Sequence, residues 1–165
     1  MSVEPLPTNA YIPGGPFPRP EESDYRPETL RSDSTAYLHG FSLFNAGFYW
    51  EAHEVWECLW HGAGRVGPVA DLLRGLIKLA AAGVKVRQNQ RHGVVTHATR
   101  AAAVFDSARA ASSTSTLLGM DLIKLAEIAR SLAESPPSTE SKLSDSIVRI
   151  FDFTLLPNES TAHEA

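Results

Sequence analysis

The segment His53-Glu54-Val55-Trp56-Glu57 has the residue types and the spacing of a metal-binding helix. On an α-helix, His53 and Glu57 lie one turn apart on one face, so both side chains can reach the same divalent ion. Glu54 lies beside them, where a carboxylate can act as a general base toward a water molecule. The pattern is similar to the zinc-protease sequence H-E-x-x-H with its second His replaced by Glu. One hypothesis is therefore a divalent metal site, for example for zinc, that supports hydrolysis.

A zinc site needs a third protein ligand, and the sequence offers four histidines that spacing alone cannot separate. These candidates are His39, His61, His92 and His97. A di-iron bundle would need Glu-x-x-His on two helices, and the sequence has no such pair. It also has no Gly-rich phosphate loop, nucleophile elbow or Cys-x-x-Cys pair, so nucleotide hydrolysis, serine chemistry and thiol redox have no support.

The same acidic face allows a second hypothesis that needs no ligand. The helix has no Lys or Arg at i±4 to offset its acids, whereas the next predicted helix carries a basic stripe. If the two helices form an antiparallel hairpin, a partly buried ion network can join them, with the planar fork of Arg74 over Glu51 or Glu54. The members of this polar cluster would be Glu51, Glu54, Glu57, Arg74 and Lys78, with His53 hydrogen-bonded among them. Removing Arg74 would then cost a few kcal/mol.

Apolar residues at spacings of three and four predict an all-α fold, a compact bundle of about five helices. The expected helices cover residues 35–46, 48–60, 68–88, 94–111 and 122–134. Gly67-Pro68 is a typical start for the third helix, and Asp121 is a typical N-cap for the fifth. His92-Gly93 is interpreted as the break before the fourth helix.

Two segments outside the bundle are expected to be irregular. Residues 1–34 hold seven of the eleven prolines, which excludes a helix or a central strand there. Tyr11, Ile12 and Phe17 among these prolines favour an arm docked on residues 35–135, with a disordered tail as the alternative. Residues 136–165 are interpreted as a loop, an extended segment at 147–156 that covers the bundle, and a loose end.

The length of 165 residues indicates a single domain. With 15 Lys+Arg against 19 Asp+Glu, the net charge of -4 and the lack of a basic patch argue against nucleic acid as a partner. We expect small-molecule or protein partners, with a homo-oligomer or a non-catalytic binding module as alternatives to an enzyme. A lone Cys58, no signal peptide and no apolar run long enough to cross a bilayer predict a cytoplasmic protein that does not enter membranes.

The stretch Phe44-Asn45-Ala46-Gly47 through Trp60, followed by Arg74-Gly75-Leu76-Ile77-Lys78, resembles the domain-of-unknown-function family 309. The resemblance covers roughly residues 35–110 and lies in an asparagine-glycine turn, an acidic helix reading E-A-H-E-x-x-E-x-x-W and a helix that contains R-G-L-I-Q in the family. It implies a small all-α bundle, and some relatives carry the label "predicted metal-dependent hydrolase". This chain has Lys78 where the family commonly has Gln, and Lys85 where many members have His. The second difference removes one ligand that the resemblance would imply.

Overall fold

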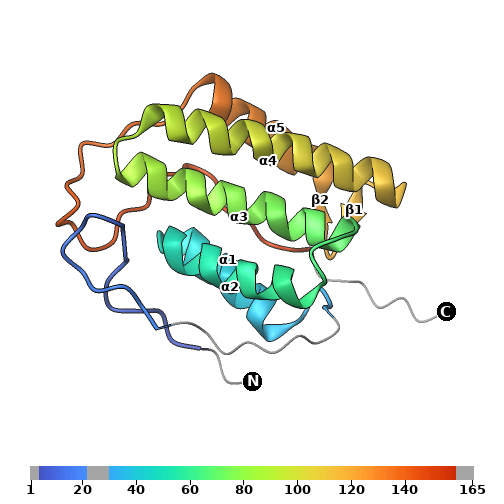
Figure 1. The fold of residues 1–165 in the computed structure, drawn as a ribbon, viewed down its shortest axis with the longest axis horizontal. Coiled ribbons are helices and arrows are strands. Elements are labelled where there is room, and N and C mark those ends of the chain that lie inside the picture. Colours follow the sequence, from blue (N-terminus) through green and yellow to red (C-terminus); the bar gives the residue numbers. More distant parts are fainter. Residues whose placement is uncertain (1–3, 22–29, 159–165) are drawn as a thin grey trace.

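The computed structural model describes residues 4–21 and 30–158, and five helices account for most of this part of the chain (Figure 1). The helices are α1 (Thr35–Ala46), α2 (Tyr49–Gly62), α3 (Pro68–Arg87), α4 (Arg91–Ser112) and α5 (Leu122–Glu134). A two-residue antiparallel hairpin, β1 (Thr116–Leu117) and β2 (Met120–Asp121), connects α4 to α5. The predicted all-α bundle is therefore confirmed, and the small hairpin is an addition to it.

The helix ends lie within two residues of the predicted ones except at the start of α4. Asp121 caps α5 by accepting hydrogen bonds from the N–H groups of Ile123 and Lys124, at 3.0 and 3.2 Å. The predicted break at His92-Gly93 is wrong, because both residues lie inside α4. The turn comes earlier, at Asn89, which adopts the left-handed conformation with φ 56°. Gly93 has instead a packing role, described below.

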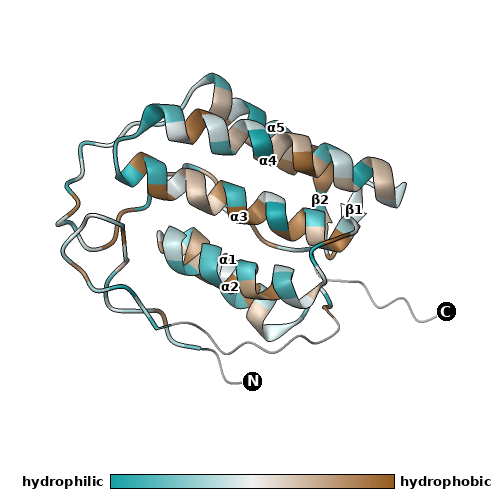
Figure 2. Cartoon of the chain, in the orientation of Figure 1, coloured by the Kyte–Doolittle hydropathy of each residue, from teal (hydrophilic) through white to brown (hydrophobic). Residues whose placement is uncertain are grey.

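Each helix packs mainly on its neighbour in the chain, so α2 and α3 form the predicted hairpin and α3 packs on α4 (Figure 1). Hydrophobic residues, brown in Figure 2, lie where these helices face one another. Two glycines of α3 allow close approach: a Cβ at Gly83 would lie 2.6 Å from Cδ1 of Tyr49, and one at Gly75 would clash with the ring of Phe105. No helix in the described part of the chain is both long and apolar enough to cross a membrane.

Residues 147–156 are irregular and lie across α1 and α2, as predicted, whereas the predicted loose end falls on residues 159–165, outside the described part of the chain. The amide of Asn45 donates from Nδ2 to the carbonyl of Leu155 at 2.7 Å and accepts from the Leu155 N–H at 2.8 Å. Phe151 is buried and stacks on Phe44 with a centroid distance of 5.5 Å. The asparagine of the N-A-G turn thus forms a two-sided clamp for a segment more than one hundred residues away.

The described part of the arm, residues 4–21, lies against the bundle. Ala10 and Ile12 are buried, and the ring of Tyr11 meets the ring of Trp50 edge to face at a centroid distance of 5.0 Å. Nε2 of Gln88, just after α3, donates a hydrogen bond to the carbonyl of Pro13 at 3.1 Å. These contacts agree with the prediction of a docked arm. They place Tyr11 and Pro13 beside the N-terminal end of α2, close to its acidic face.

Candidate metal centre and the adjoining pocket

The outward face of α2 carries the three residues singled out by the sequence, and their side chains lie together. Nδ1 of His53 is 3.4 Å from a carboxylate oxygen of Glu54, and Nε2 of His53 is 3.5 Å from one of Glu57. One ligand atom from each residue can be chosen so that all three lie within 4.8 Å of one another. All three residues are half-buried. The imidazole is therefore held between two carboxylates.

The amphipathic pattern of α2 explains why these side chains are on the outside. Ala52, Val55, Trp56 and Leu59 are all buried on the inner face, against α1 and α3. At 100° per residue, His53, Glu54 and Glu57 must then point away from that core. The contact from Nδ1 of His53 to Glu54 lacks hydrogen-bond geometry, so this buried nitrogen has no hydrogen-bond partner. The cluster retains capacity for a further bond.

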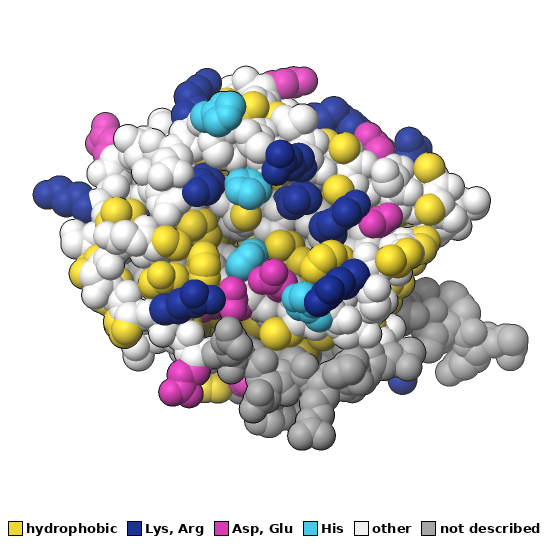
Figure 3. All heavy atoms as spheres, in the orientation of Figure 1, with side chains coloured by type: hydrophobic (Ala, Val, Ile, Leu, Met, Phe, Trp, Pro, Cys, Tyr) yellow, Lys and Arg dark blue, Asp and Glu magenta, His cyan; other side chains and the backbone are white. Residues whose placement is uncertain are grey.

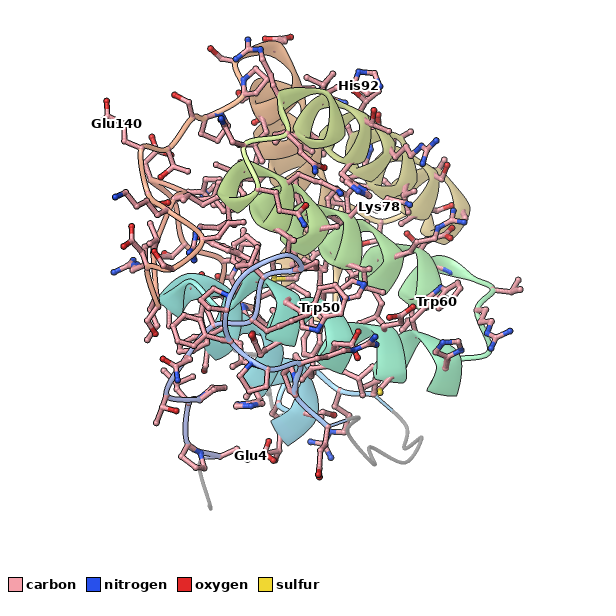
Figure 4. All side chains as sticks on the ribbon, turned by 60° about the vertical axis from the view of Figure 1, so that its left-hand side comes forward. Glu4, Trp50, Trp60, Lys78, His92 and Glu140 are labelled. Carbon is pink, nitrogen blue, oxygen red and sulfur yellow. The ribbon has the colours of Figure 1, made fainter. Side chains whose placement is uncertain are left out.

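The structure separates the four histidines that the sequence could not. His39 pairs with Glu4 at 3.5 Å, and Nδ1 of His61 accepts a hydrogen bond from Arg65 at 2.8 Å. His92 is exposed on the first turn of α4, far from α2 (Figure 4). His97 alone of the four lines the same cavity as His53. It lies outside the group of three ligand atoms within 4.8 Å, so it borders the candidate site from α4.

Glu51 has a different partner from the one predicted. Its Oε1 accepts a hydrogen bond from the N–H of Tyr11 at 2.7 Å, while Oε2 is buried with no hydrogen-bond partner. The side chain belongs to a residue only 6% exposed, and this burial raises the pKa of Glu51 to about 7, although the Tyr11 hydrogen bond acts in the opposite direction. Glu51 therefore anchors the arm.

The basic stripe on α3 does not form the predicted ion network with α2. Arg74 is exposed and pairs with Asp71, one turn earlier on its own helix, at 3.4 Å. Lys78 lies among cations: burial lowers the pKa of its ammonium group, and the charges of Arg100 and Arg74 lower it further. No ion pair in the described ranges joins Arg74 or Lys78 to Glu51, Glu54 or Glu57. The two helices pack through apolar contacts instead.

A cavity of about 270 Å³ lies beside His53, between α2, α3, α4 and the arm. It is lined by Pro13, Trp50, His53, Ala81, Val84, Lys85, Gln88 and His97. Figure 3 shows the charge pattern on this side of the molecule: histidines in the middle, acidic groups over α2, and Lys and Arg side chains over α3 and α4. Figure 4 shows Trp50 under the arm and Lys78 on the side of α3 that faces α4.

A known family matches the part of the chain that contains α2 and α3. Residues 37–97 match the family model described as a domain of unknown function, DUF309. The match confirms the predicted resemblance to this family. It runs from α1 to the His97 position of α4, so it includes the three clustered residues and most of the cavity residues. No curated protein matches the chain. The description of this family names no reaction.

Six cavity residues were not proposed as site residues from the sequence: Pro13, Trp50, Ala81, Val84, Lys85 and Gln88. They come from the start of α2, the C-terminal half of α3 with its C-cap, and the arm, which are separated by long stretches of chain. Gln88 gives no local signal, because a polar residue at the C-terminus of a helix is ordinary. Pro13 follows Tyr11 and Ile12 in the arm that was predicted to dock, so the docking prediction is the only sequence feature that could have placed it near the site.

Proposed function

We propose that this protein, whose residues 37–97 match DUF309, binds a divalent metal ion through His53 and Glu57, with Glu54 as a third ligand or as the general base, and acts as a metal-dependent hydrolase on a small molecule. The observation that carries the proposal is the grouping of three ligand atoms within 4.8 Å on a half-buried helix face, next to a cavity. Catalytic zinc sites typically use three protein ligands and keep a further position open.

The donor set fits such an ion. One imidazole nitrogen and two carboxylate oxygens suit Zn²⁺ or Mn²⁺ better than a soft ion such as Cu(I), which prefers sulfur. Either separation, 3.4 Å from Nδ1 of His53 to Glu54 or 3.5 Å from Nε2 to Glu57, is near the roughly 3.4 Å expected between two ligands of a tetrahedral ion with bonds of about 2.1 Å. An ion uses one nitrogen of His53, so one glutamate side chain has to turn toward that nitrogen when the ion binds.

A bound ion would polarise a carbonyl or phosphoryl group and lower the pKa of a coordinated water. The residues of the chain supply the rest. His53, on the border between cluster and cavity, would direct the ion toward the substrate. Glu54 is either the third ligand or the general base, and Glu54→Gln distinguishes these roles. Loss of a ligand lowers metal affinity, whereas loss of a base leaves affinity unchanged and abolishes turnover.

The test is calorimetric titration of chelator-treated protein with Zn²⁺ and Mn²⁺. We expect one site in the wild type, and a loss of affinity in His53→Ala and Glu57→Gln that exceeds the roughly 10–100-fold typical of outer-shell substitutions. His92→Ala is the matched control, since His92 is an exposed histidine far from the cluster. Equal affinity in His53→Ala and in the wild type would overturn the proposal. Hydrolysis is then assayed with esters, amides and phosphoesters.

A further inference from the structure

The cavity next to the candidate metal centre has the dimensions of a site for a small molecule. Its volume of about 270 Å³ is just below the usual range for ligand pockets, which starts near 300 Å³. Trp50, Val84 and Ala81 give it an apolar wall, and Pro13 of the arm closes one side. A ligand with a single ring or a short chain would fit this volume.

Positive charge gathers on the α3 and α4 sides of the cavity. Lys85 lines it directly. Burial lowers the pKa of the His97 imidazole, and the positive charges of Lys78, Lys85 and Arg100 lower it further. Among the described residues, no Asp or Glu lines the cavity and none of these three cations forms an ion pair. Like charges held this close without a counterion favour a bound anion.

The lysine in the wall is held in place by its neighbours. A Cβ at Gly93 would lie 2.8 Å from Cδ of Lys85, so the absence of a side chain at Gly93 makes room for the lysine stem. Nζ of Lys85 donates a hydrogen bond to Oε1 of Gln90 at 3.0 Å, which leaves two of its three protons for another acceptor. This explains why a glycine occurs in the first turn of α4, where the sequence suggested a break.

Four buried polar atoms around the cavity have no hydrogen-bond partner. They are Nε1 of Trp50, Nδ1 of His53, Oε1 of Gln88 and Nδ1 of His97. Buried polar atoms in folded proteins are usually hydrogen-bonded, and each exception calls for a partner such as water or a ligand. Four exceptions on the residues that line one cavity indicate a site that a polar ligand completes.

We propose that this cavity binds a small organic oxyanion, with its carboxylate or phosphate head between Lys85 and His97 and its apolar body against Trp50 and Val84. The proposal rests on the proposed function in one respect, because it names the substrate class that would reach a metal ion at His53. Glu54 and Glu57 lie outside the cavity and repel an anion when no ion offsets their charge. Metal ion and oxyanion should therefore strengthen each other's binding.

The probe is benzoate, with benzamide as a neutral control of nearly the same shape, titrated into chelator-treated protein and followed by the NMR shifts of Trp50, Val84 and His97. We expect benzoate to bind at least about tenfold more tightly than benzamide. Lys85→Met, which keeps the stem that packs on Gly93, should lose at least about tenfold in benzoate affinity. The control Lys124→Met, an exposed lysine on α5, should lose nothing. Phenyl phosphate then shows which head group is preferred.

The design separates this inference from the metal proposal. Glu57→Gln removes a proposed metal ligand that does not line the cavity, so its metal-free form should bind benzoate at least as well as the wild type. If the wild type binds benzoate but takes up no metal in the calorimetric titration, the first result supports the anion site and the second refutes the metal centre. Equal affinities for benzoate and benzamide, or unchanged benzoate affinity in folded Lys85→Met, overturn the anion site whatever the metal titration gives.

Discussion

The main-chain N–H of Tyr11 donates a hydrogen bond to the carboxylate of Glu51 at 2.7 Å, and this contact joins the arm to the helix that carries the candidate metal centre. Glu51 was predicted to face a cation on α3. Its observed partner is instead a neutral backbone group forty residues earlier in the chain. A buried carboxylate with one backbone donor and no cation is costly to ionise, and this makes the docking of the arm sensitive to pH.

Stability should fall as pH rises through 7, because the folded protein retains the Glu51 proton that the unfolded chain releases. The ordinary pKa of Glu51 is 4.5 and burial raises it to about 7, so the stabilising effect of the proton is complete below pH 4.5 and lost above pH 7. Glu51→Gln mimics the protonated form and should be more stable than the wild type at pH 8 by about 1–3 kcal/mol. Urea unfolding with a chelator present, at pH 5 and pH 8, measures the difference. A constant difference between the two proteins at both pH values would contradict the prediction.

Truncating Ile12 should destabilise the protein, because this side chain of the arm is only 2% exposed. We expect Ile12→Ala to cost about 2–4 kcal/mol. Leu6→Ala is the control in the same arm, since Leu6 is 46% exposed and should change stability by less than about 0.5 kcal/mol. Thermal unfolding of both variants measures this, and equal melting temperatures would indicate that the arm contributes nothing.

Breaking the clamp between Asn45 and Leu155 should release the C-terminal segment. Asn45→Ala removes one donor and one acceptor and leaves two buried backbone groups unpaired, for a cost of about 2–4 kcal/mol. Leu155→Ala should cost a similar amount because Leu155 is 3% exposed, whereas Leu156→Ala, at 72% exposed, should be neutral. Hydrogen exchange of the Leu155 amide checks the mechanism, since it should become faster in Asn45→Ala.

Substituting Arg74 should have little effect, contrary to the expectation from the sequence. Its ion pair with Asp71 has a distance of 3.4 Å and its side chain is 45% exposed, and exposed pairs of this kind contribute about 0–1 kcal/mol. Arg74→Met should therefore unfold within about 1 kcal/mol of the wild type in urea. A loss of several kcal/mol at pH 7 that disappears in acid would instead indicate the buried ion network.

The sequence by itself determined the parts of this protein that depend on local chemistry. The helix positions, the Asp121 cap, the irregular C-terminal cover and the common face of His53, Glu54 and Glu57 follow from periodicity and capping, which act within a few residues. The same reasoning misplaced the start of α4, because it treated Gly93 as a break. The absence of a side chain there makes room for Lys85, a contact visible only once α3 and α4 are packed.

Only the tertiary structure decided which partners these residues meet. Glu51 pairs with Tyr11, and His97 is the one of the four candidate histidines that lines the cavity beside His53. These contacts join segments that are far apart in the sequence, so residue spacing cannot predict them. The rotation and offset of packed helices are set by the interlocking of buried side chains, such as Tyr49 on Gly83. A shift of one turn along α3 moves a side chain by about 5.4 Å, enough to exchange one ion-pair partner for another. The sequence therefore predicted the acidic face of α2, but it did not predict which residues of other segments contact that face.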